Sequence, residues 1–514
     1  MENIGFDFGT TNSTLSYVDP DSGRLNCFKL NASDGEYSPT VISYGKNNRI
    51  SIGEEAKMDL TEPGKDAYDN FKLGLISDFD KPIPNRDKTP GELAHDYIKT
   101  ILDRYKEATK IAPKKIVMTI PERCFYDKSN TVKKYIETIW SDIGYRNIQL
   151  HSEPIAATAY YCWKYQEENK KPYKGSVLVV DYGGGTLDVT LCMVTESGSI
   201  RPLERFDGKY DNTNGCAGVA FDEAVISILL KEKGQSLERS DRKFILLRND
   251  FEKKKIAKTA QISEEMQEYF RNKEVYSQDE PELFTITVEE IKLEVHCKHL
   301  DEAFDKANRE ALESSLKQMS ERFSAQGVDP ASHETFQVLL IGGFSNFWSV
   351  QNYVQGHFSN VLKKNPRFND LLTRENRTLA IAKGAAVIAN GTIVEEVCTH
   401  DIGIILGKYN SNGAWEDQYI RLITKGESLS NLEKLKYGIS VQVWGNDGPV
   451  RLYIGSDRKP FEIKGGVQEL LKAETYPASF KLGVAVDGNL DMTLYVQAPS
   501  GKETSKYLTN LNNC

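Results

Sequence analysis

The residues best suited to chemistry lie in a glycine-rich turn between two apolar segments. An apolar run from Val177 ends in Asp181, and Gly183–Gly185 and Thr186 follow before an alternating run resumes. Apolar runs on both sides of glycines predict two strands joined by a tight turn. Because glycines bring bare N–H groups against a ligand, and a carboxylate and a hydroxyl flank them here, we expect a phosphate site with a divalent metal. The alternative is an ordinary glycine-rich hairpin.

The same pattern occurs near the start of the sequence. An apolar segment from Ile4 ends in Asp7, and a glycine and small hydroxyl residues follow before an alternating segment that reaches Val18. A further apolar run ends in the paired glycines Gly342 and Gly343. Two similar aspartate–glycine turns indicate two similar halves that face one another. Three such loops can converge on a polyphosphate in a cleft, so the repetition favours the phosphate site over the ordinary hairpin.

Composition argues against several classes of function. The formal net charge is -9 and no basic run carries interleaved aromatic residues, which argues against nucleic acid as the main partner. No apolar run is long enough to span a bilayer, and the early strand leaves no room for a signal peptide, so we expect no membrane partner. The eight cysteines are scattered without zinc-ligand spacing. A reducing, cytoplasmic compartment is the simplest expectation.

The segments around these loops alternate between predicted strands and helices. Thr89–Glu92 predicts a helix start, with a capping threonine and a proline at the first helical position. A strand is expected over Lys115–Ile120, a helix over about 128–142, and a second helix from Glu153. This rhythm indicates an α/β fold with internally repeated halves.

A highly charged stretch from 240 to about 275 is helical in pattern. Glu252, Lys255 and Thr259 fall at i, i+3 and i+7, so they share one face of the predicted helix. The spacing alone is typical of a solvated stripe of ion pairs. A further long helix is expected over about 288–323.

The sequence pattern changes from about His400. Short alternating segments dominate, and Asp-Gly pairs at 447–448 and 487–488 are typical of hairpin turns. We therefore predict an α/β domain over residues 1–390, a linker over 391–399, and an antiparallel β domain of sandwich type over 400–514.

Taken together, these motifs resemble those of the DnaK-type chaperones of the seventy-kilodalton heat-shock family, within the actin-like ATPase superfamily. I-G-F-D-F-G-T-T-N-S is similar to the first phosphate motif of that family, and V-V-D-Y-G-G-G-T-L-D-V-T resembles the second. H-S-E-P-I-A-A-T-A-Y and A-I-A-K-G-A-A-V resemble its two connecting helices, and L-I-G-G-F-S-N-F-W resembles its adenosine motif. The resemblance covers residues 1 to about 390. It implies a two-lobed actin-like fold of repeated ribonuclease-H-like halves, with ATP between the lobes.

The resemblance also implies four catalytic residues, namely Lys72, Glu153, Asp181 and Thr186. Lys72 would contact the phosphates and stabilise charge on the transferred group. Glu153 would order water around the metal, and Thr186 would lie near the γ-phosphate and the attacking water. These roles are chemically coherent, because phosphoryl transfer needs mostly positioning and charge neutralisation.

Metal and nucleotide contacts follow from the same resemblance. Asp7 and Asp181 would hold Mg²⁺ through its waters, and Asp188 would help to hold a monovalent cation such as K⁺. Further contacts to ATP or ADP are implied for Gly9, Thr10, Thr11, Asn12, Gly183, Gly184, Gly185, Gly218, Glu252, Lys255, Thr259, Gly342, Gly343, Phe344 and Asn346.

The chain departs from the family pattern in places that concern the base and the β domain. Family members usually grip adenine between two arginines, but Ile256 and Asn346 stand at the matching positions. The loop over 217–222 lacks the acidic pair of the family, and the linker lacks its run of leucines. The chain stops near the end of the β portion, so we expect no helical lid.

We therefore expect a slow, Mg²⁺-dependent ATPase with a chaperone-like function, whose β domain binds extended peptides through strand edges. The resemblance implies an unfolded or extended peptide client and a co-chaperone or nucleotide-exchange factor as partners. Two alternatives stay open, namely a nucleotide-gated interaction module with little turnover and a small-molecule kinase on the same fold. The chaperone-type motif set and the trailing β domain speak against the kinase.

Overall fold

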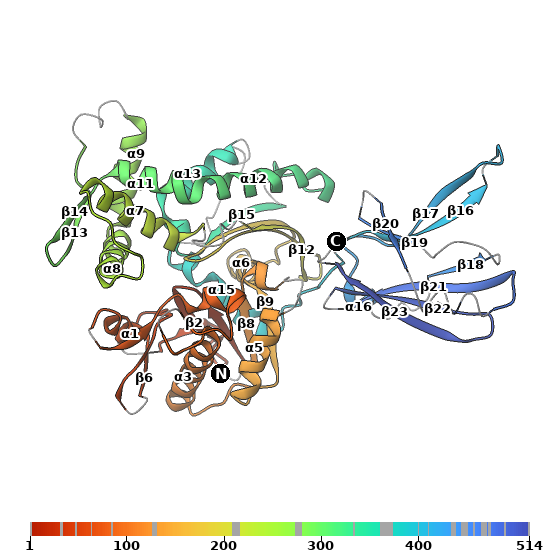
Figure 1. Cartoon of the computed structure of the whole chain (residues 1–514), viewed down its shortest axis with the longest axis horizontal. Coiled ribbons are helices and arrows are strands. Elements are labelled where there is room, and N and C mark those ends of the chain that lie inside the picture. The colour runs from red at the N-terminus through yellow and green to blue at the C-terminus, as the bar shows by residue number, and fades with distance from the viewer. Residues whose placement is uncertain are drawn as a thin grey trace. The chain divides into compact units, whose positions relative to one another are not determined.

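The chain divides into two compact units. The computed structural model describes residues 3–30, 34–46, 49–62, 64–83, 86–125, 131–207, 216–272, 280–332, 335–359, 374–398, 400–409, 411–432, 438–443, 451–455, 458–463, 470, 474–487 and 490–511. The larger unit comprises Met1–Phe125, Thr131–Ile200 and Glu204–Ile393, and the smaller unit contains Val394–Cys514. Figure 1 shows helices in both halves of the larger unit, and strands as the main elements of the smaller unit.

The first half of the larger unit is built on a mixed sheet of order β3-β2-β1-β8-β9. Its central strand β1 runs antiparallel to β2 and parallel to β8. The sheet consists of β1 (Asn3–Phe8), β2 (Asn12–Val18), β3 (Leu25–Phe28), β8 (Lys115–Ile120) and β9 (Ile148–Ser152), with β4 (Ser38–Pro39) paired to β2. A small sheet of β5 (Ile42–Tyr44), β6 (Ile50–Ile52) and β7 (Asp66–Tyr68) and the helices α1 (Glu54–Asp59), α2 (Phe71–Ser77), α3 (Pro90–Thr109), α4 (Glu122–Phe125) and α5 (Thr131–Asp142) complete this half.

The second half repeats this plan with a sheet of order β12-β11-β10-β15. Its central strand β10 again runs antiparallel to the next strand, β11, and parallel to a later one, β15. The strands are β10 (Gly175–Tyr182), β11 (Leu187–Val194), β12 (Ile200–Asp207) and β15 (Phe336–Ile341), beside a hairpin of β13 (Phe284–Val288) and β14 (Ile291–Val295). The helices are α7 (Gly218–Glu232), α8 (Arg242–Ala257), α9 (Thr259–Arg271), α11 (Cys297–Phe304), η2 (Asp305–Arg309), α12 (Glu310–Arg322), η3 (Ser324–Gln326), η4 (Phe344–Asn346) and α13 (Trp348–His357). The repetition confirms the predicted α/β fold of two similar halves.

Two helices, α6 (Glu153–Asn169) and α15 (Arg374–Ala389), pack against each other at the junction of the halves. Glycines allow this contact, because a Cβ added at Gly384 would lie 1.7 Å from the carbonyl oxygen of Ala156. A Cβ added at Gly5 on β1 would lie 2.1 Å from the backbone nitrogen of Ala386. A larger residue at either glycine would push α15 away from α6 or β1, and with it the strand ends that carry the site.

Local sequence signals decide the start of α3. The backbone N–H of Glu92 donates to Thr89 Oγ1 at 3.1 Å, and the N–H of Thr89 donates to Glu92 Oε2 at 2.9 Å. This reciprocal pair is the capping box that Thr89 and Glu92 predict. Helix α5 begins at Thr131 in the described part of the chain, and residues 128–130 of the predicted helix lie outside it.

The long helix expected over about 288–323 is wrong in its first part. Residues up to Val295 form the hairpin of β13 and β14, and α11 begins only at Cys297. Side chains are buried at every second position on both strands, and Glu289 in the turn has a φ of 51°. Alternating burial stabilises a two-stranded ribbon against the neighbouring helix α8, and this outweighs the helical preference of the charged residues.

The smaller unit contains two antiparallel four-stranded sheets, of order β17-β16-β19-β20 and β18-β21-β22-β23. Their strands are β16 (Ile402–Tyr409), β17 (Trp415–Ile423), β18 (Ile439–Val443), β19 (Arg451–Ile454), β20 (Lys459–Glu462), β21 (Ala478–Val486), β22 (Asp491–Gln497) and β23 (Glu503–Asn510), with the short helix α16 (Leu429–Leu432). One apolar core takes Ile404 and Leu452 from the first sheet and Phe480 and Leu494 from the second. Two sheets that share a core form the predicted sandwich.

The start of the smaller unit is tied to a loop of its first sheet. Val397 forms a bridge with Ser428, and the N–H of Cys398 donates to the carbonyl of Glu427 at 2.8 Å. The expected turn at 447–448 lies outside the described residues, as does Gly488 of the expected turn at 487–488. The strands on both sides of the second turn, β21 and β22, pair antiparallel, and the N–H of Leu490 donates to the carbonyl of Asp487 at 2.9 Å. The division into residues 1–390, 391–399 and 400–514 stays a prediction.

Candidate functional site

The two aspartate–glycine turns meet inside the larger unit. A Cβ added at Gly184 would lie 2.5 Å from Thr11 Cγ2, and one added at Gly185 would lie 2.5 Å from Thr10 Oγ1. The turn between β10 and β11 therefore touches the turn between β1 and β2, and no side chain fits between them. The third glycine loop joins them, because a Cβ at Gly342 would lie 2.7 Å from Asp181 Oδ1. The three loops converge, as the repeated pattern predicts.

Each turn places a carboxylate at the end of a central strand. Asp7 ends the apolar part of β1 and Asp181 that of β10, and both side chains are buried. Burial and the charge of Glu153 raise the pKa of Asp7 to about 7. Burial, Glu153 and Asp7 raise the pKa of Asp181 well above its usual value. The fold thus holds together carboxylates that oppose one another's ionisation.

These carboxylates fit a hard cation. Asp181 Oδ2 is buried, and no hydrogen-bond partner for it is found within the described part of the chain. Buried carboxylate oxygens are the donors that Mg²⁺ prefers, and a divalent charge would remove the repulsion between Asp7 and Asp181. No group of three or more His, Cys, Asp or Glu side chains among the described residues is placed to hold a metal ion.

Lys72 supplies the positive charge of the site. It lies on α2, which follows Asn70 in the left-handed conformation that asparagine tolerates. Its ammonium donates to Glu153 Oε1 at 3.0 Å, and both side chains are buried. Burial favours the neutral amine, but Glu153 and Asp7 outweigh that effect and raise the pKa of Lys72. Lys72 therefore stays charged, and it lines a cavity of about 20 Å³ together with Thr10 and Thr186.

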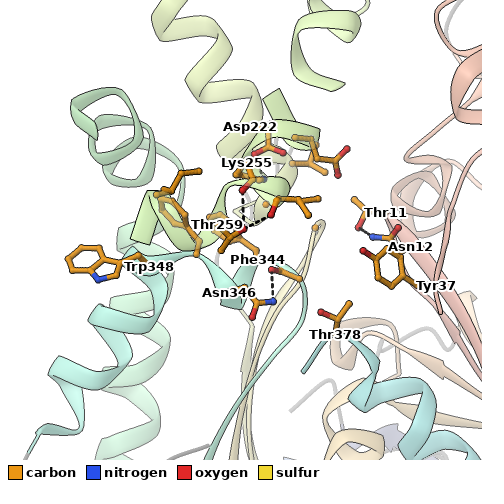
Figure 2. A pocket seen from close by; sticks show the side chains of 18 of the residues that line it. Thr11, Asn12, Tyr37, Asp222, Lys255, Thr259, Phe344, Asn346, Trp348 and Thr378 are labelled. Atoms are coloured by element: carbon orange, nitrogen blue, oxygen red, sulfur yellow. Dashed lines mark hydrogen bonds and ion pairs between the residues drawn. The ribbon is translucent and has the colours of Figure 1, made fainter. Parts of the chain in front are cut away.

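A pocket of about 490 Å³ opens beside the turns. Figure 2 shows Thr11, Asn12 and Tyr37 on one side of it and Lys255, Thr259 and Asn346 on the other. The predicted residues that line it are Thr11, Asn12, Gly184, Gly218, Glu252, Lys255, Thr259, Gly343, Phe344 and Asn346. Its size suits a nucleotide, since ligand pockets commonly measure about 300–1,000 Å³.

The start of α7 is hydrogen-bonded to the glycine turn between β10 and β11. The N–H of Gly218 donates to the carbonyl of Gly183 at 3.1 Å, and that of Val219 donates to Gly184 at 2.8 Å. These hydrogen bonds hold the first turn of α7 against the glycines. A helix N-terminus at this place favours a negatively charged ligand.

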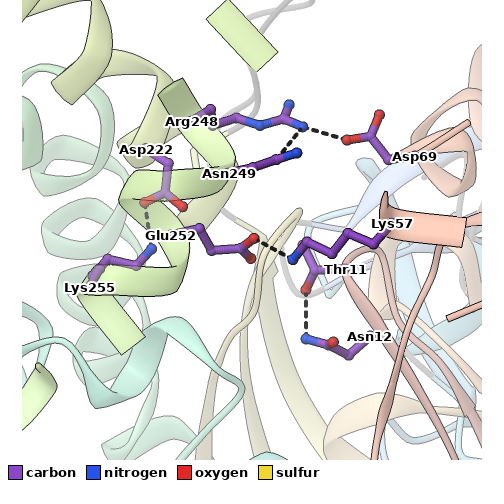
Figure 3. A network of polar contacts seen from close by, with 9 residues as sticks. All are labelled: Thr11, Asn12, Lys57, Asp69, Asp222, Arg248, Asn249, Glu252 and Lys255. Carbon is purple, nitrogen blue, oxygen red and sulfur yellow. Dashed lines mark hydrogen bonds and ion pairs between the residues drawn. The ribbon is translucent and has the colours of Figure 1, made fainter. Parts of the chain in front are cut away.

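Ion pairs join the two halves across the pocket. Lys57 Nζ on α1 lies 2.9 Å from Glu252 Oε2 on α8, and Arg248 on α8 pairs with Asp69 of the first half (Figure 3). Burial would raise the pKa of Glu252, but Lys57 and Lys255 outweigh it and hold that pKa below its usual range. The charged face of the predicted helix is therefore part of a pocket wall. Its interpretation as a solvated stripe is wrong.

Lys255 on α8 also forms an ion pair with Asp222, a residue that was not predicted for the site. Asp222 lies on α7, and the pair is drawn in Figure 3. Burial raises the pKa of Asp222 to about 6, against the opposing effect of Lys255. Tyr37, Trp348 and Thr378 line the pocket as well. Trp348 is the last residue of the segment that resembles the adenosine motif, and Thr378 lies just before the segment that resembles the second connecting helix, whereas no local pattern marks Tyr37.

All residues predicted for the site lie in the larger unit. Gly9 stands at the first turn, where a Cβ would lie 2.2 Å from the carbonyl oxygen of Asn12. Asp188 on β11 is the register partner of Asp181 and is buried. Their contacts to a nucleotide or a cation stay predictions.

Comparison with known proteins points in one direction. The family model described as Hsp70 protein matches residues 85–405. The chain is similar to the chaperone protein DnaK of Thermosipho africanus, at 25% identity over 390 residues, which cover 75% of this chain and 58% of that protein. It is also similar to DnaK of Thermotoga petrophila, at 24% identity over 88% of this chain and 72% of that protein. DnaK of Mycoplasma mycoides shares 27% identity over 77% and 60% of the two chains. The chain thus spans less than two thirds of the first of these relatives.

Proposed function

The chain belongs to the Hsp70 family, and on this premise we propose that its larger unit binds ATP or ADP with Mg²⁺ and hydrolyses ATP slowly. The observation that carries the proposal is the contact between two aspartate–glycine turns from different halves beside a nucleotide-sized pocket. Hsp70 proteins are ATPases, and the matched region contains the second turn, α8 and the third glycine loop.

Lys72 and Thr186 are the residues that we assign to the chemical step. The charged ammonium of Lys72, which is held by Glu153, stabilises negative charge on the phosphoryl group that is being transferred. Thr186 lines the same small cavity and orients the attacking water through its hydroxyl. Electrostatic stabilisation of this kind supplies most of the rate, because phosphoryl transfer requires little covalent help from the protein.

Asp7 and Asp181 hold the metal in this proposal. When bound, Mg²⁺ neutralises the charge of the β- and γ-phosphates. The two carboxylates would hold this ion, and Glu153 fixes the ammonium of Lys72 beside them. The N-terminus of α7 lies beside the second turn, where the positive end of the helix dipole would favour the negative charge of the phosphates.

Thr186→Ala tests the assignment. We expect nucleotide affinity to stay within about threefold of the parent and single-turnover hydrolysis to fall at least about tenfold, because the water loses one positioning group. Release of free phosphate, measured beside transfer to sugars and carboxylic acids, separates an ATPase from a small-molecule kinase. An unchanged single-turnover rate would remove Thr186 from the chemical step.

A nucleotide-gated interaction module is the second candidate, and the ion pairs across the pocket favour it. Lys57–Glu252 and Arg248–Asp69 link the two halves directly, so bound nucleotide and lobe closure affect one another. If the rate of ATP hydrolysis is well below the rate of nucleotide exchange, this candidate is favoured over the ATPase.

For the smaller unit we propose binding of extended peptide along a strand edge. Among the described residues, β17 and β20 are the edge strands of one sheet, and β18 and β23 are the edge strands of the other. Exposed tyrosines stand on two of these outer strands, Tyr419 on β17 and Tyr507 on β23. Such edges pair with extended chains.

The resulting partners are an unfolded or extended peptide client, with a co-chaperone or exchange factor acting on the larger unit. A peptide array probed with and without ATP tests the client, and equal binding in both conditions contradicts coupling.

A further inference from the structure

Asn308 lies in a widened turn of a long helix in the second half of the larger unit. The helix runs from α11 into α12, and the π-helical turn η2 (Asp305–Arg309) joins them. Within η2, whose residues all belong to the described part of the chain, Asn308 alone is buried, with 1% of its surface exposed. Such turns interrupt the regular pattern of an α-helix and are frequent at functional sites. The buried amide of Asn308 therefore calls for an explanation from its contacts.

The amide nitrogen of Asn308 contacts three oxygen atoms of the segments around it. Its Nδ2 donates to the carbonyl of Cys216 at 2.8 Å and to that of Ala217 at 3.3 Å. It also lies 3.2 Å from the hydroxyl of Tyr182, which itself donates to the carbonyl of Cys216 at 2.6 Å. Because carbonyl oxygens only accept, Nδ2 and not Oδ1 must face this group. Oδ1 is buried without a hydrogen-bond partner among the described residues, and this costs free energy. The stabilising contribution of the amide thus comes from the groups that Nδ2 holds.

The partners of Asn308 adjoin the glycine turn between β10 and β11 on two sides. Tyr182 directly precedes Gly183, the first glycine of that turn. The other partners lead into α7, whose N-cap residue, Ala217, makes no side-chain capping bond. The first N–H groups of α7 donate instead to the carbonyls of Gly183 and Gly184. Asn308 therefore closes a ring of hydrogen bonds that begins and ends at the glycine turn.

We infer that Asn308 is a positioning residue for ATP hydrolysis, because it fixes the start of α7 and, through α7 and Tyr182, the glycine turn beside the phosphates. The inference rests on the proposed function, which brings the phosphates next to Gly183–Gly185. Asn308 touches neither the nucleotide nor the metal, and it acts through the hydrogen bonds behind the turn. A displacement of about 1 Å at a reacting group can lower a rate about 10²-fold, so a small shift of this turn is enough to slow the reaction.

Asn308→Leu in the full chain tests the inference, because leucine has nearly the same size and donates no hydrogen bond. Single-turnover hydrolysis at saturating ATP and Mg²⁺ should fall about tenfold or more, at a temperature where thermal unfolding shows the variant to be folded. The matched control is Asn169→Leu, which removes an amide that donates to the carbonyl of Tyr165 at 3.0 Å, at the end of α6 remote from Glu153. That control should keep the parent rate within about twofold, because its hydrogen bond does not support the turn.

Asn308→Asp keeps the size of the amide and makes the donor depend on pH. The ionised carboxylate only accepts and would face the carbonyls of Cys216 and Ala217, whereas the protonated acid donates one hydrogen bond to them. Burial favours the protonated acid, so the hydrolysis rate of this variant relative to the parent should rise as the pH falls from about 8 to about 6. A role confined to stability would leave this ratio constant in the folded proteins.

The outcomes separate this inference from the proposed function. If the parent hydrolyses ATP and folded Asn308→Leu does so within about twofold of the parent rate, the inference is overturned and the proposed function stands. If Asn308→Leu does not fold, the pH profile of Asn308→Asp decides, and a constant ratio to the parent overturns the inference. If the parent neither binds nor hydrolyses ATP, the proposed function fails, and the inference fails with it.

Discussion

Two regions of the candidate site, which we call the phosphate end and the base end, are built from different kinds of residue. At the phosphate end, Asp7, Asp181, Glu153 and Lys72 are buried together, and their charges depend on one another. The base end is the part of the pocket lined by Ile256, Ile262, Phe344, Asn346 and Trp348. Ile256 is exposed there, and Asn346 Oδ1 is buried without a hydrogen-bond partner among the described residues. The comparison teaches that phosphate chemistry demands particular charges in particular places, whereas the base end offers mainly apolar side chains and one amide. Changes at the phosphate end should therefore cost far more than changes at the base end.

The largest effect is expected from Lys72→Ala. Removal of the ammonium takes away the charge that stabilises the transferred group, so single-turnover ATP hydrolysis should fall about 10²- to 10³-fold. The matched control is Lys81→Ala, an exposed lysine of the same half that pairs with neighbouring Asp78. A hydrolysis rate of Lys72→Ala within about threefold of the parent would mean that the charge of Lys72 does not stabilise the transferred group.

Asp181→Asn should give the next largest effect, with opposite signs for binding and for stability. Loss of one carboxylate should weaken the dependence of ATP affinity on Mg²⁺ about 10- to 100-fold. Because burial disfavours the charged form of Asp181, the amide should also raise the melting temperature of the nucleotide-free protein. Calorimetry with and without Mg²⁺, beside thermal unfolding, checks both, and Asp21→Asn at an exposed turn is the control. Equal Mg²⁺ dependence in parent and variant would contradict the metal assignment.

A smaller effect is expected between the ends, at the ion pair that joins the halves. Lys57→Ala leaves Glu252 without its partner on α1, so the halves should open more readily and bound nucleotide should leave several-fold faster. Stopped-flow release of a fluorescent ADP measures this rate, and Lys65→Ala on the same half is the control. Release no faster than in the parent would show that the pair does not hold the pocket closed.

The smallest effect is expected from Tyr182→Phe, beside the second turn. Tyr182 donates its hydroxyl to the carbonyl of Cys216 at 2.6 Å, but Asn308 Nδ2 donates to the same carbonyl at 2.8 Å. Because the carbonyl keeps one partner, stability should fall by only about 1 kcal/mol, with hydrolysis nearly unchanged. Denaturant unfolding tests this against Tyr173→Phe, whose hydroxyl is bonded to the carbonyl of Ser176 at 2.9 Å. A large loss of hydrolysis would place Tyr182 in the positioning of the turn.

Much of the phosphate end could be predicted because its chemistry is local in sequence. Asp181, three glycines and Thr186 lie within one turn, and a strand–turn–strand pattern is enough to place them. The capping box of Thr89 and Glu92 is local in the same way. The repeated halves followed from the two similar aspartate–glycine turns, whereas the order of the strands in the sheets was not predicted.

Contacts between distant segments could not be predicted. Lys57 and Glu252 stand 195 positions apart and Lys255 and Asp222 stand 33 apart, so no spacing marks them as pairs. The charged face of α8 therefore resembled a solvated stripe until its partners were seen. The hairpin before α11 was missed because charged residues alternate with its apolar ones, and a short alternating run among many charges is easily taken for a helix.

The central claim is that the two aspartate–glycine turns hold one metal-bound triphosphate between them. A crystal structure of the full chain with Mg²⁺ and a non-hydrolysable ATP analogue tests it most directly. We predict that the triphosphate lies between Thr10–Asn12 and Gly183–Gly185, with the metal beside Asp7 and Asp181 and the base against Ile256. A nucleotide bound elsewhere, or a metal remote from both aspartates, would contradict the account.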